Sequence, residues 1–199
     1  MSSLTIAGEG GQPSLEGSWI GTGERAAIVA PPHPLLGGHL SNPVVQALAM
    51  GLGAGGVRAL LFNWRGVGDS QGNASGEPDD AEQDYLAALG LASRAAGQVV
   101  AAGYSFGAAA ALRIAARDAR VGSAIAVAPP PALLAGCPLE RLGGRFTVIA
   151  AEHDGIAPAS ELSPVVARAG GRLEVLSETE HFFAHALARV SELARDALT

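Results

Sequence analysis

Short apolar runs of strand length recur along this chain, and most of them end at glycine, proline or a charged residue. They occupy residues 26–30, 57–64, 98–103, 121–128, 145–151 and 172–176. Apolar residues on both faces of such runs are typical of parallel strands that helices cover on both sides. Residues 4–7 and 14–20 are expected to add a hairpin of two short strands at the N-terminus.

Segments with helical character stand between the apolar runs. They cover residues 43–52, 80–96, 106–117, 159–169 and 182–198. Pro43 suits a first helical turn, with Ser41 or Asn42 as the capping residue before it. The alternation of strand and helix predicts the α/β class, with a mostly parallel central sheet and right-handed crossovers. Because ligands bind at the carboxyl ends of such strands, catalytic residues are expected at the junctions that follow them.

Composition and charge limit the classes of protein to which this chain can belong. A chain of 199 residues with 48% hydrophobic and 16% charged residues fits a single globular domain spanning residues 1–199. The net charge of -6, without a basic cluster, argues against a nucleic-acid partner. No apolar stretch reaches about 18 residues and the N-terminus lacks signal-peptide features, so we expect no membrane segment and a cytoplasmic location. Cys137 is the only cysteine, which excludes an internal disulfide and a cysteine-based metal site.

A candidate nucleophile follows the run at residues 98–103. The pentapeptide GYSFG at residues 103–107 matches G-x-S-x-G, and it stands between a predicted strand and a predicted helix. In that context a tight turn lifts the serine above the sheet, and the helix N-terminus favours developing negative charge. The second match, GDSQG at residues 68–72, leads into loop-forming residues. We therefore predict Ser105 as the nucleophile and interpret Ser70 as a polar loop residue.

Acid and base candidates follow the nucleophile in the order Ser, acid, His. His181 comes directly after the last predicted strand and is the predicted general base. Asp154 comes after the strand at 145–151 and is the predicted acid that orients it, with Glu152 as a weaker alternative. His185 is expected inside the final helix. A His pair at this spacing can bind zinc, but a third ligand and the Glu of H-E-x-x-H are lacking, so no metal is expected.

An oxyanion hole needs two backbone N–H donors. One is expected from Phe106, the residue after the nucleophile. The other is expected from the loop PPHPLLGG at residues 31–38. Prolines have no N–H, which leaves His33 or Leu35, and His33 is preferred.

These motifs together resemble a known family. The features are HPLLGG at residues 33–38, FNWRGVGDS at 62–70, the turn at Ser105, and Asp154 with His181. In this order they resemble the α/β-hydrolase superfamily, in particular small lidless bacterial hydrolases related to dienelactone hydrolase and to serine-aminopeptidase-like esterases. The resemblance implies an α/β-hydrolase fold with a minimal cap or none, and a structural role for Arg65 in holding its loop.

The chain departs from this family at two points. The family loop often reads His-Pro-His-Pro, whereas Pro31 stands here in place of the first histidine. Dienelactone hydrolase uses a cysteine nucleophile, whereas Cys137 lies far from the G-x-S-x-G turn in this sequence. Dienelactone hydrolysis is therefore not the favoured activity.

The predicted function is cofactor-free hydrolysis of carboxylic esters or thioesters through an acyl-enzyme. The connection at residues 129–144 is too short for a multi-helix cap, so the substrates are expected to be small molecules with short acyl groups. A homo-oligomer is compatible with the sequence. One alternative is a peptidase or aminopeptidase, which would need an acidic anchor for the substrate amine. Another is a non-catalytic binding protein, because fold does not fix function.

Overall fold

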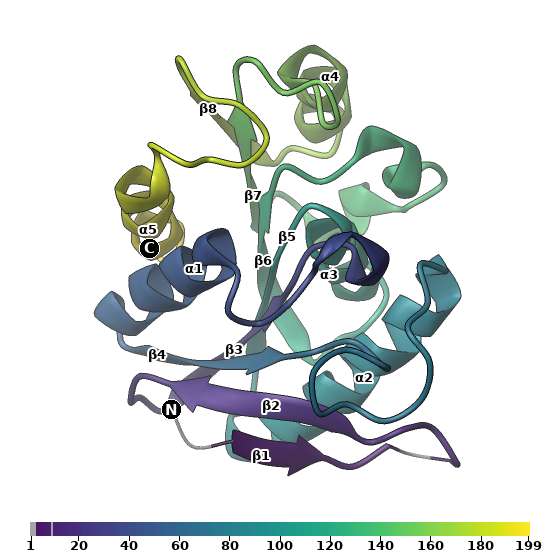
Figure 1. The fold of residues 1–199 in the computed structure, drawn as a ribbon. Coiled ribbons are helices and arrows are strands. Elements are labelled where there is room, and N and C mark those ends of the chain that lie inside the picture. Colours follow the sequence, from purple (N-terminus) through teal and green to yellow (C-terminus); the bar gives the residue numbers. More distant parts are fainter. Residues whose placement is uncertain (1–2, 9) are drawn as a thin grey trace.

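The computed structural model describes residues 3–8 and 10–199, which build one eight-stranded sheet with helices on both faces (Figure 1). The strands are β1 (Ser3–Ile6), β2 (Leu15–Ile20), β3 (Arg25–Ala30), β4 (Val57–Phe62), β5 (Val99–Tyr104), β6 (Val121–Val127), β7 (Phe146–Ala151) and β8 (Arg172–Leu176). Their order across the sheet is β1-β2-β4-β3-β5-β6-β7-β8. The pairs from β4 to β8 are parallel, which confirms the predicted sheet.

The N-terminal strands form the expected hairpin. β1 and β2 pair antiparallel, from Ser3 opposite Ser18 to Ile6 opposite Leu15. β2 then pairs antiparallel with β4, so the hairpin extends the parallel sheet at one edge.

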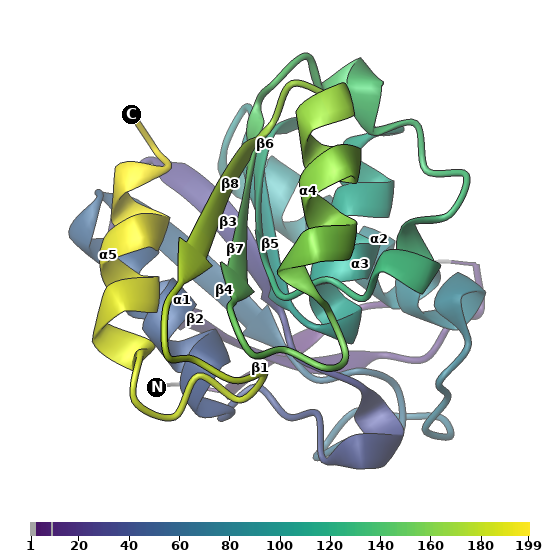
Figure 2. The same ribbon diagram turned by 90° about the horizontal axis from the view of Figure 1, so that it is seen from above.

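Helices cover both faces of the sheet (Figure 2). The helices are α1 (Pro43–Ala54), α2 (Pro78–Ala95), α3 (Phe106–Ala115), α4 (Ala159–Arg168) and α5 (Leu187–Asp196). α1 and α5 pack together on one side, and α2, α3 and α4 lie on the other. Asn42, rather than Ser41, caps α1, because its side-chain oxygen accepts the Val44 N–H at 2.9 Å.

The last helix begins later than the sequence predicts. α5 starts at Leu187, whereas helical character suggested residue 182. Phe183 is fully buried with a φ of 53°, which an α-helix cannot contain. Tight turns link Glu180 to Phe183 and Phe183 to Ala186, each closed by a backbone hydrogen bond of 3.0 Å. The expectation that His185 lies inside a helix is therefore wrong, since it lies in this turn segment.

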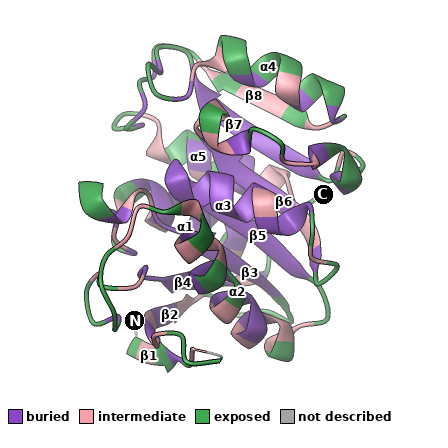
Figure 3. Cartoon of the chain, turned by 90° about the vertical axis from the view of Figure 1, so that its right-hand side faces the viewer, coloured by how far each residue is buried: buried purple, intermediate pink, exposed green. Residues whose placement is uncertain are grey.

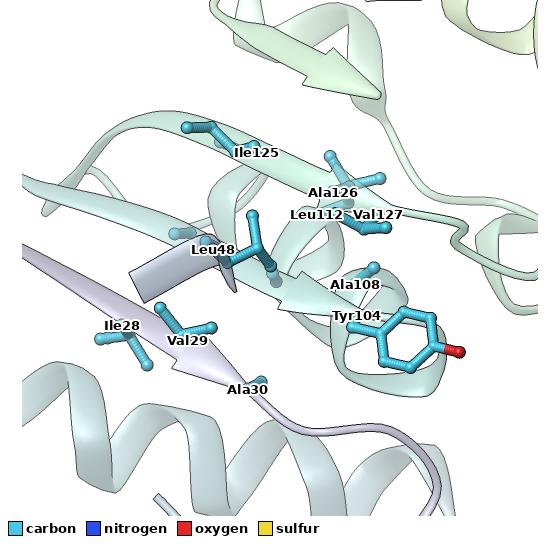
Figure 4. Packing of buried hydrophobic residues seen from close by; sticks show 14 of the residues in the cluster. Ile28, Val29, Ala30, Leu48, Tyr104, Ala108, Leu112, Ile125, Ala126 and Val127 are labelled. Atoms are coloured by element: carbon cyan, nitrogen blue, oxygen red, sulfur yellow. The ribbon is translucent and has the colours of Figure 1, made fainter. Parts of the chain in front are cut away.

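Helix α3 is buried at the centre of the fold, whereas the outer face of α4 is exposed (Figure 3). The alanines of α3 let this helix lie close to the sheet. Ala108 and Leu112 of α3 lie among residues of β3, β5 and β6 (Figure 4). A Cβ at Gly107 would clash with the carbonyl oxygens of Ala30 and Pro31. The glycine is therefore what allows α3 to start directly beside the end of β3.

The segment after β6, where an inserted cap could stand, is short. It contains only two 3₁₀ helices, η2 (Pro131–Leu134) and η3 (Leu139–Leu142), so the carboxyl edge of the sheet carries no cap. Among the described residues, no helix has the length and apolar character that crossing a membrane requires.

The loop between β4 and α2 is fixed by Arg65. Its backbone N–H and its Nε donate to the two carboxylate oxygens of Asp84, at 2.8 and 2.9 Å, and a guanidinium nitrogen pairs with Asp80. Burial raises the pKa of the Asp84 carboxyl, and the bonds from Arg65 oppose that rise. Arg65 thus holds its loop against α2, as the family resemblance implies.

Candidate active site

Ser105 lies in a strained turn between β5 and α3. Its φ of 53° and ψ of −118° are values that side-chain-bearing residues rarely adopt. A Cβ at Gly103 would clash with the backbone of Gly107, so both glycines of the motif are required by close approach. The Ser105 N–H donates to the Val127 carbonyl of β6 at 2.8 Å, which fixes the turn at the carboxyl edge of the sheet.

Three predicted side chains meet at this turn. His181 Nε2 lies 3.1 Å from Ser105 Oγ, and His181 Nδ1 lies 2.7 Å from Asp154 Oδ2. All three residues are buried. A hydroxyl next to an imidazole that a carboxylate holds from behind is the arrangement that activates a serine for attack on an acyl carbon.

Asp154 is anchored by the turn that follows β7. Its Oδ1 accepts the N–H groups of Ile156 and Ala157 at 2.8 and 2.7 Å, while Oδ2 faces His181. Burial tends to raise the pKa of the Asp154 carboxyl, but the hydrogen bonds from His181, Ala157 and Ile156 outweigh it and leave the pKa below its ordinary value. The group is therefore a carboxylate at neutral pH.

Tyr104 supports the histidine from below, and sequence reasoning missed this residue. Its hydroxyl donates to the His181 carbonyl at 2.9 Å, and the two rings lie 5.5 Å apart. Burial, and then the charge of Asp154, raise the pKa of Tyr104 to about 12, so the hydroxyl keeps its proton at neutral pH. Tyr104 occupies a variable position of G-x-S-x-G, so the motif gives no signal for this contact.

The side chains of Phe106 and His33, whose backbone N–H groups are the expected oxyanion donors, lie next to each other. Phe106 opens α3, and its ring contacts the His33 ring with centroids 4.9 Å apart. The Leu35 N–H donates to His33 Nδ1 at 3.2 Å. Because that N–H is engaged, His33 is the stronger of the two candidates that the loop offers.

A pocket of about 430 Å³ opens above Ser105. Its walls come from the loop after β3, the turn at Ser105, the segment after β6, and the turns that carry Asp154 and His181. The lining residues are Pro32, His33, Leu36, Gly37, Asn42, Tyr104, Ser105, Phe106, Pro130, Leu133, Ile156, His181 and Phe182. This described lining contains no Asp, Glu, Lys or Arg, so the pocket is mainly apolar around the reactive groups.

Comparison with known proteins places this chain in a family. The chain matches the alpha/beta hydrolase family over residues 30–198. It belongs to that family. The fold and the match together make this protein a hydrolase of the small lidless kind.

Solved structures resemble this α/β hydrolase along nearly its whole length. An alpha-beta serine hydrolase homologue from Coxiella burnetii is 27% identical with a TM-score of 0.86, covering 100% of this chain and 97% of that one. A serine hydrolase without a lid from Xanthomonas campestris is 25% identical with a TM-score of 0.84, covering 99% and 93%. An uncharacterised protein of Rickettsia prowazekii is 28% identical over 190 residues, which is 86% of this chain and 77% of that protein.

The second G-x-S-x-G match of the hydrolase has a structural role. Ser70 is buried, donates its hydroxyl to the Asn63 carbonyl at 2.8 Å and accepts the Glu16 N–H at 2.9 Å. It links β2 to the loop after β4. Ser70 is therefore not brought into the site, and it is more than the polar loop residue expected from the sequence.

Of the remaining polar candidates, Glu152 is exposed and accepts the Glu178 N–H at 2.9 Å, so it does not replace Asp154 beside His181. Ligand atoms of Glu152, His153 and Glu178 lie within 4.8 Å of one another, and this is the described cluster whose chemistry could hold a metal ion. All three are exposed, and they lie outside the pocket above Ser105.

Proposed function

We propose that this hydrolase cleaves carboxylic esters or thioesters through an acyl-enzyme formed on Ser105. The observation that carries the proposal is the continuous contact from Asp154 through His181 to Ser105, with distances of 2.7 and 3.1 Å, at a strained turn below an open pocket.

In the proposed reaction, Ser105 Oγ attacks the acyl carbon while His181 Nε2 takes the hydroxyl proton. Asp154 stabilises the imidazolium that forms. The negative charge on the acyl oxygen is stabilised by the N–H groups of Phe106 and His33. His181 then gives its proton to the leaving oxygen or sulfur, and the alcohol or thiol departs. In the second half, water loses a proton to His181 and attacks the acyl carbon. The bond to Ser105 Oγ then breaks, His181 returns the proton to that oxygen, and the acid leaves.

The missing cap supports short acyl groups as the preferred substrates. Only the 3₁₀ helices η2 and η3 stand where a cap could cover a long chain. Each buried CH₂ contributes about 0.8 kcal/mol, and an open site buries few of them. Specificity constants are therefore expected to fall from acetate toward palmitate, without activation at a lipid interface.

The pocket chemistry disfavours a peptidase. An aminopeptidase would need a carboxylate to bind the substrate amine, and the described lining of the pocket contains none. A non-catalytic binding protein would not need a buried carboxylate that orients the imidazole next to the serine. The peptidase alternative predicts a preference for aminoacyl anilides, and the binding-protein alternative predicts no turnover of simple esters.

The test compares p-nitrophenyl acetate with aminoacyl anilides, using matched variants. Ser105→Ala and His181→Ala should each lower kcat by roughly 10⁴-fold, because Ser105, His181 and Asp154 act as one catalytic unit and loss of either residue disables it. Ser70→Ala and His185→Ala, a serine and a histidine outside the contact, should keep most of the activity. Ester turnover that survives Ser105→Ala, or a preference for the anilides, would overturn the proposal.

A further inference from the structure

Three large apolar side chains stand exposed around the mouth of the pocket. Leu36 is 83% exposed, Phe182 is 70% exposed and Ile156 is 54% exposed. All three line the pocket above Ser105, and each comes from a different loop. We call these three residues the apolar rim. Exposed apolar surface gathered at a pocket is typical of a ligand-binding site.

The polar side chains of the pocket are largely engaged within the protein. Asn42 Oδ1 accepts the Val44 N–H, the Tyr104 hydroxyl donates to the His181 carbonyl, and His33 Nδ1 accepts the Leu35 N–H. The described lining contains no Asp, Glu, Lys or Arg. A charged substrate group would lose water here without gaining an ionic partner, which is unfavourable.

The proposed reaction fixes which part of the substrate meets the rim. His181 must give its proton to the leaving oxygen, so the alcohol part of an ester lies beside the imidazole. The Phe182 ring lies next to that imidazole, edge to face, with centroids 5.8 Å apart. Ile156 belongs to the turn that holds Asp154, and its N–H donates to the carboxylate. Phe182 therefore adjoins the leaving-group side of the site, and Ile156 lines the same pocket from the turn that holds Asp154.

We infer that the preferred substrates are uncharged esters whose alcohol part carries an apolar ring that packs against Phe182 and Ile156. This inference rests on the proposed ester hydrolysis. A ring matches the exposed aromatic side chain of Phe182, since aromatic rings pack favourably against one another. A pocket of about 430 Å³ also has room for a ring beyond the short acyl group.

The test varies the alcohol of a fixed acyl group. Ethyl, benzyl, 4-carboxybenzyl and 4-(trimethylammonio)benzyl acetates all form the same acetyl-enzyme, so differences in kcat/KM report the alcohol part alone. Each value is divided by the hydroxide-catalysed rate of the same ester, which removes differences in leaving-group reactivity. Benzyl acetate is expected to exceed ethyl acetate and both charged esters by roughly 10-fold or more.

Rim variants assign the preference to particular side chains. Phe182→Ser and Ile156→Ser should each lower the ratio of kcat/KM for benzyl acetate to kcat/KM for ethyl acetate by roughly 5- to 30-fold. Met50→Ser is the control, because Met50 is 65% exposed on α1 and does not line the pocket. Met50→Ser should leave kcat/KM unchanged for both esters.

The outcomes separate the inference from the proposed function. Equal rates for ethyl and benzyl acetates, faster turnover of a charged ester, or equal losses for both esters in the rim variants would overturn the inference alone. Absence of Ser105-dependent turnover of every acetate would overturn the proposed ester hydrolysis itself.

Discussion

At the scale of single residues, the site depends on how firmly His181 is held. Asp154 contacts its ring from one side, and Tyr104 donates a hydrogen bond to its backbone carbonyl. The chain contains two tyrosines, and the other, Tyr85, also donates its buried hydroxyl to a carbonyl, that of Ala102 at 3.2 Å. Tyr85 is therefore a matched control for Tyr104.

Tyr104→Phe keeps the ring and removes the bond to the His181 carbonyl. We expect kcat to fall by roughly 5- to 30-fold with KM nearly unchanged, because a looser imidazole spends less time in the productive orientation. Each variant loses one buried hydrogen bond, so both should lower the free energy of unfolding by about 1 kcal/mol. Tyr85→Phe should leave kcat unchanged. Equal effects of the two variants on kcat would show that Tyr104 has no positioning role.

Asp154 also makes stability depend on pH. Because its pKa is lowered in the folded protein, its stabilisation is present above the ordinary value of 3.8 and is lost as pH falls through the lowered value. The difference in unfolding free energy between wild type and Asp154→Asn should therefore shrink as pH falls below about 4. Urea titrations at each pH measure it. A difference that grows as pH falls below about 4 would contradict the assigned direction.

At the scale of elements, α3 can begin close to β3 because glycines flank the turn at Ser105. Side chains at Gly103 or Gly107 would clash with backbone atoms. The strained φ of Ser105 survives only because β5, β6 and α3 are packed around it.

Gly107→Ala should disrupt this junction. A methyl group would press on the carbonyls of Ala30 and Pro31, so we expect a loss of stability of at least about 2 kcal/mol together with loss of activity. Gly53→Ala in α1 is the control, because a Cβ there meets nothing within 4 Å. Alanine should stabilise that helix by up to about 1 kcal/mol. Thermal and urea unfolding measure both, and an unaffected Gly107→Ala would contradict the packing account.

The spacing of apolar residues along the chain predicts helices and strands well where contacts within the segment decide its structure. The order of strands and helices follows from apolar runs and amphipathic segments, and the observed strands lie within a few residues of their predicted bounds. The start of α5 was missed because Phe183 is buried against the Tyr104 ring, at 6.2 Å between centroids, and adopts a positive φ there. Such a contact joins distant parts of the chain and leaves no local signal.

At the scale of the whole molecule, the family resemblance predicted the fold and a minimal cap or none. Chain order and strand ends also led to Ser105, Asp154 and His181, since parallel strands bring their carboxyl ends to one edge. The apolar rim was not predicted, because Leu36 and Ile156 look like ordinary loop residues in the sequence and Phe182 was expected to begin the final helix. Their meeting depends on how three loops close above the sheet.

The central claim is that Ser105 is an activated nucleophile, and covalent labelling tests it most directly. The protein is treated with a fluorophosphonate, its intact mass is measured, and the modified peptide is sequenced by mass spectrometry. The account predicts one added phosphonyl group on Ser105, absent in Ser105→Ala and greatly slowed in His181→Ala. Modification of Ser70 instead, or no modification of the folded protein, would contradict it.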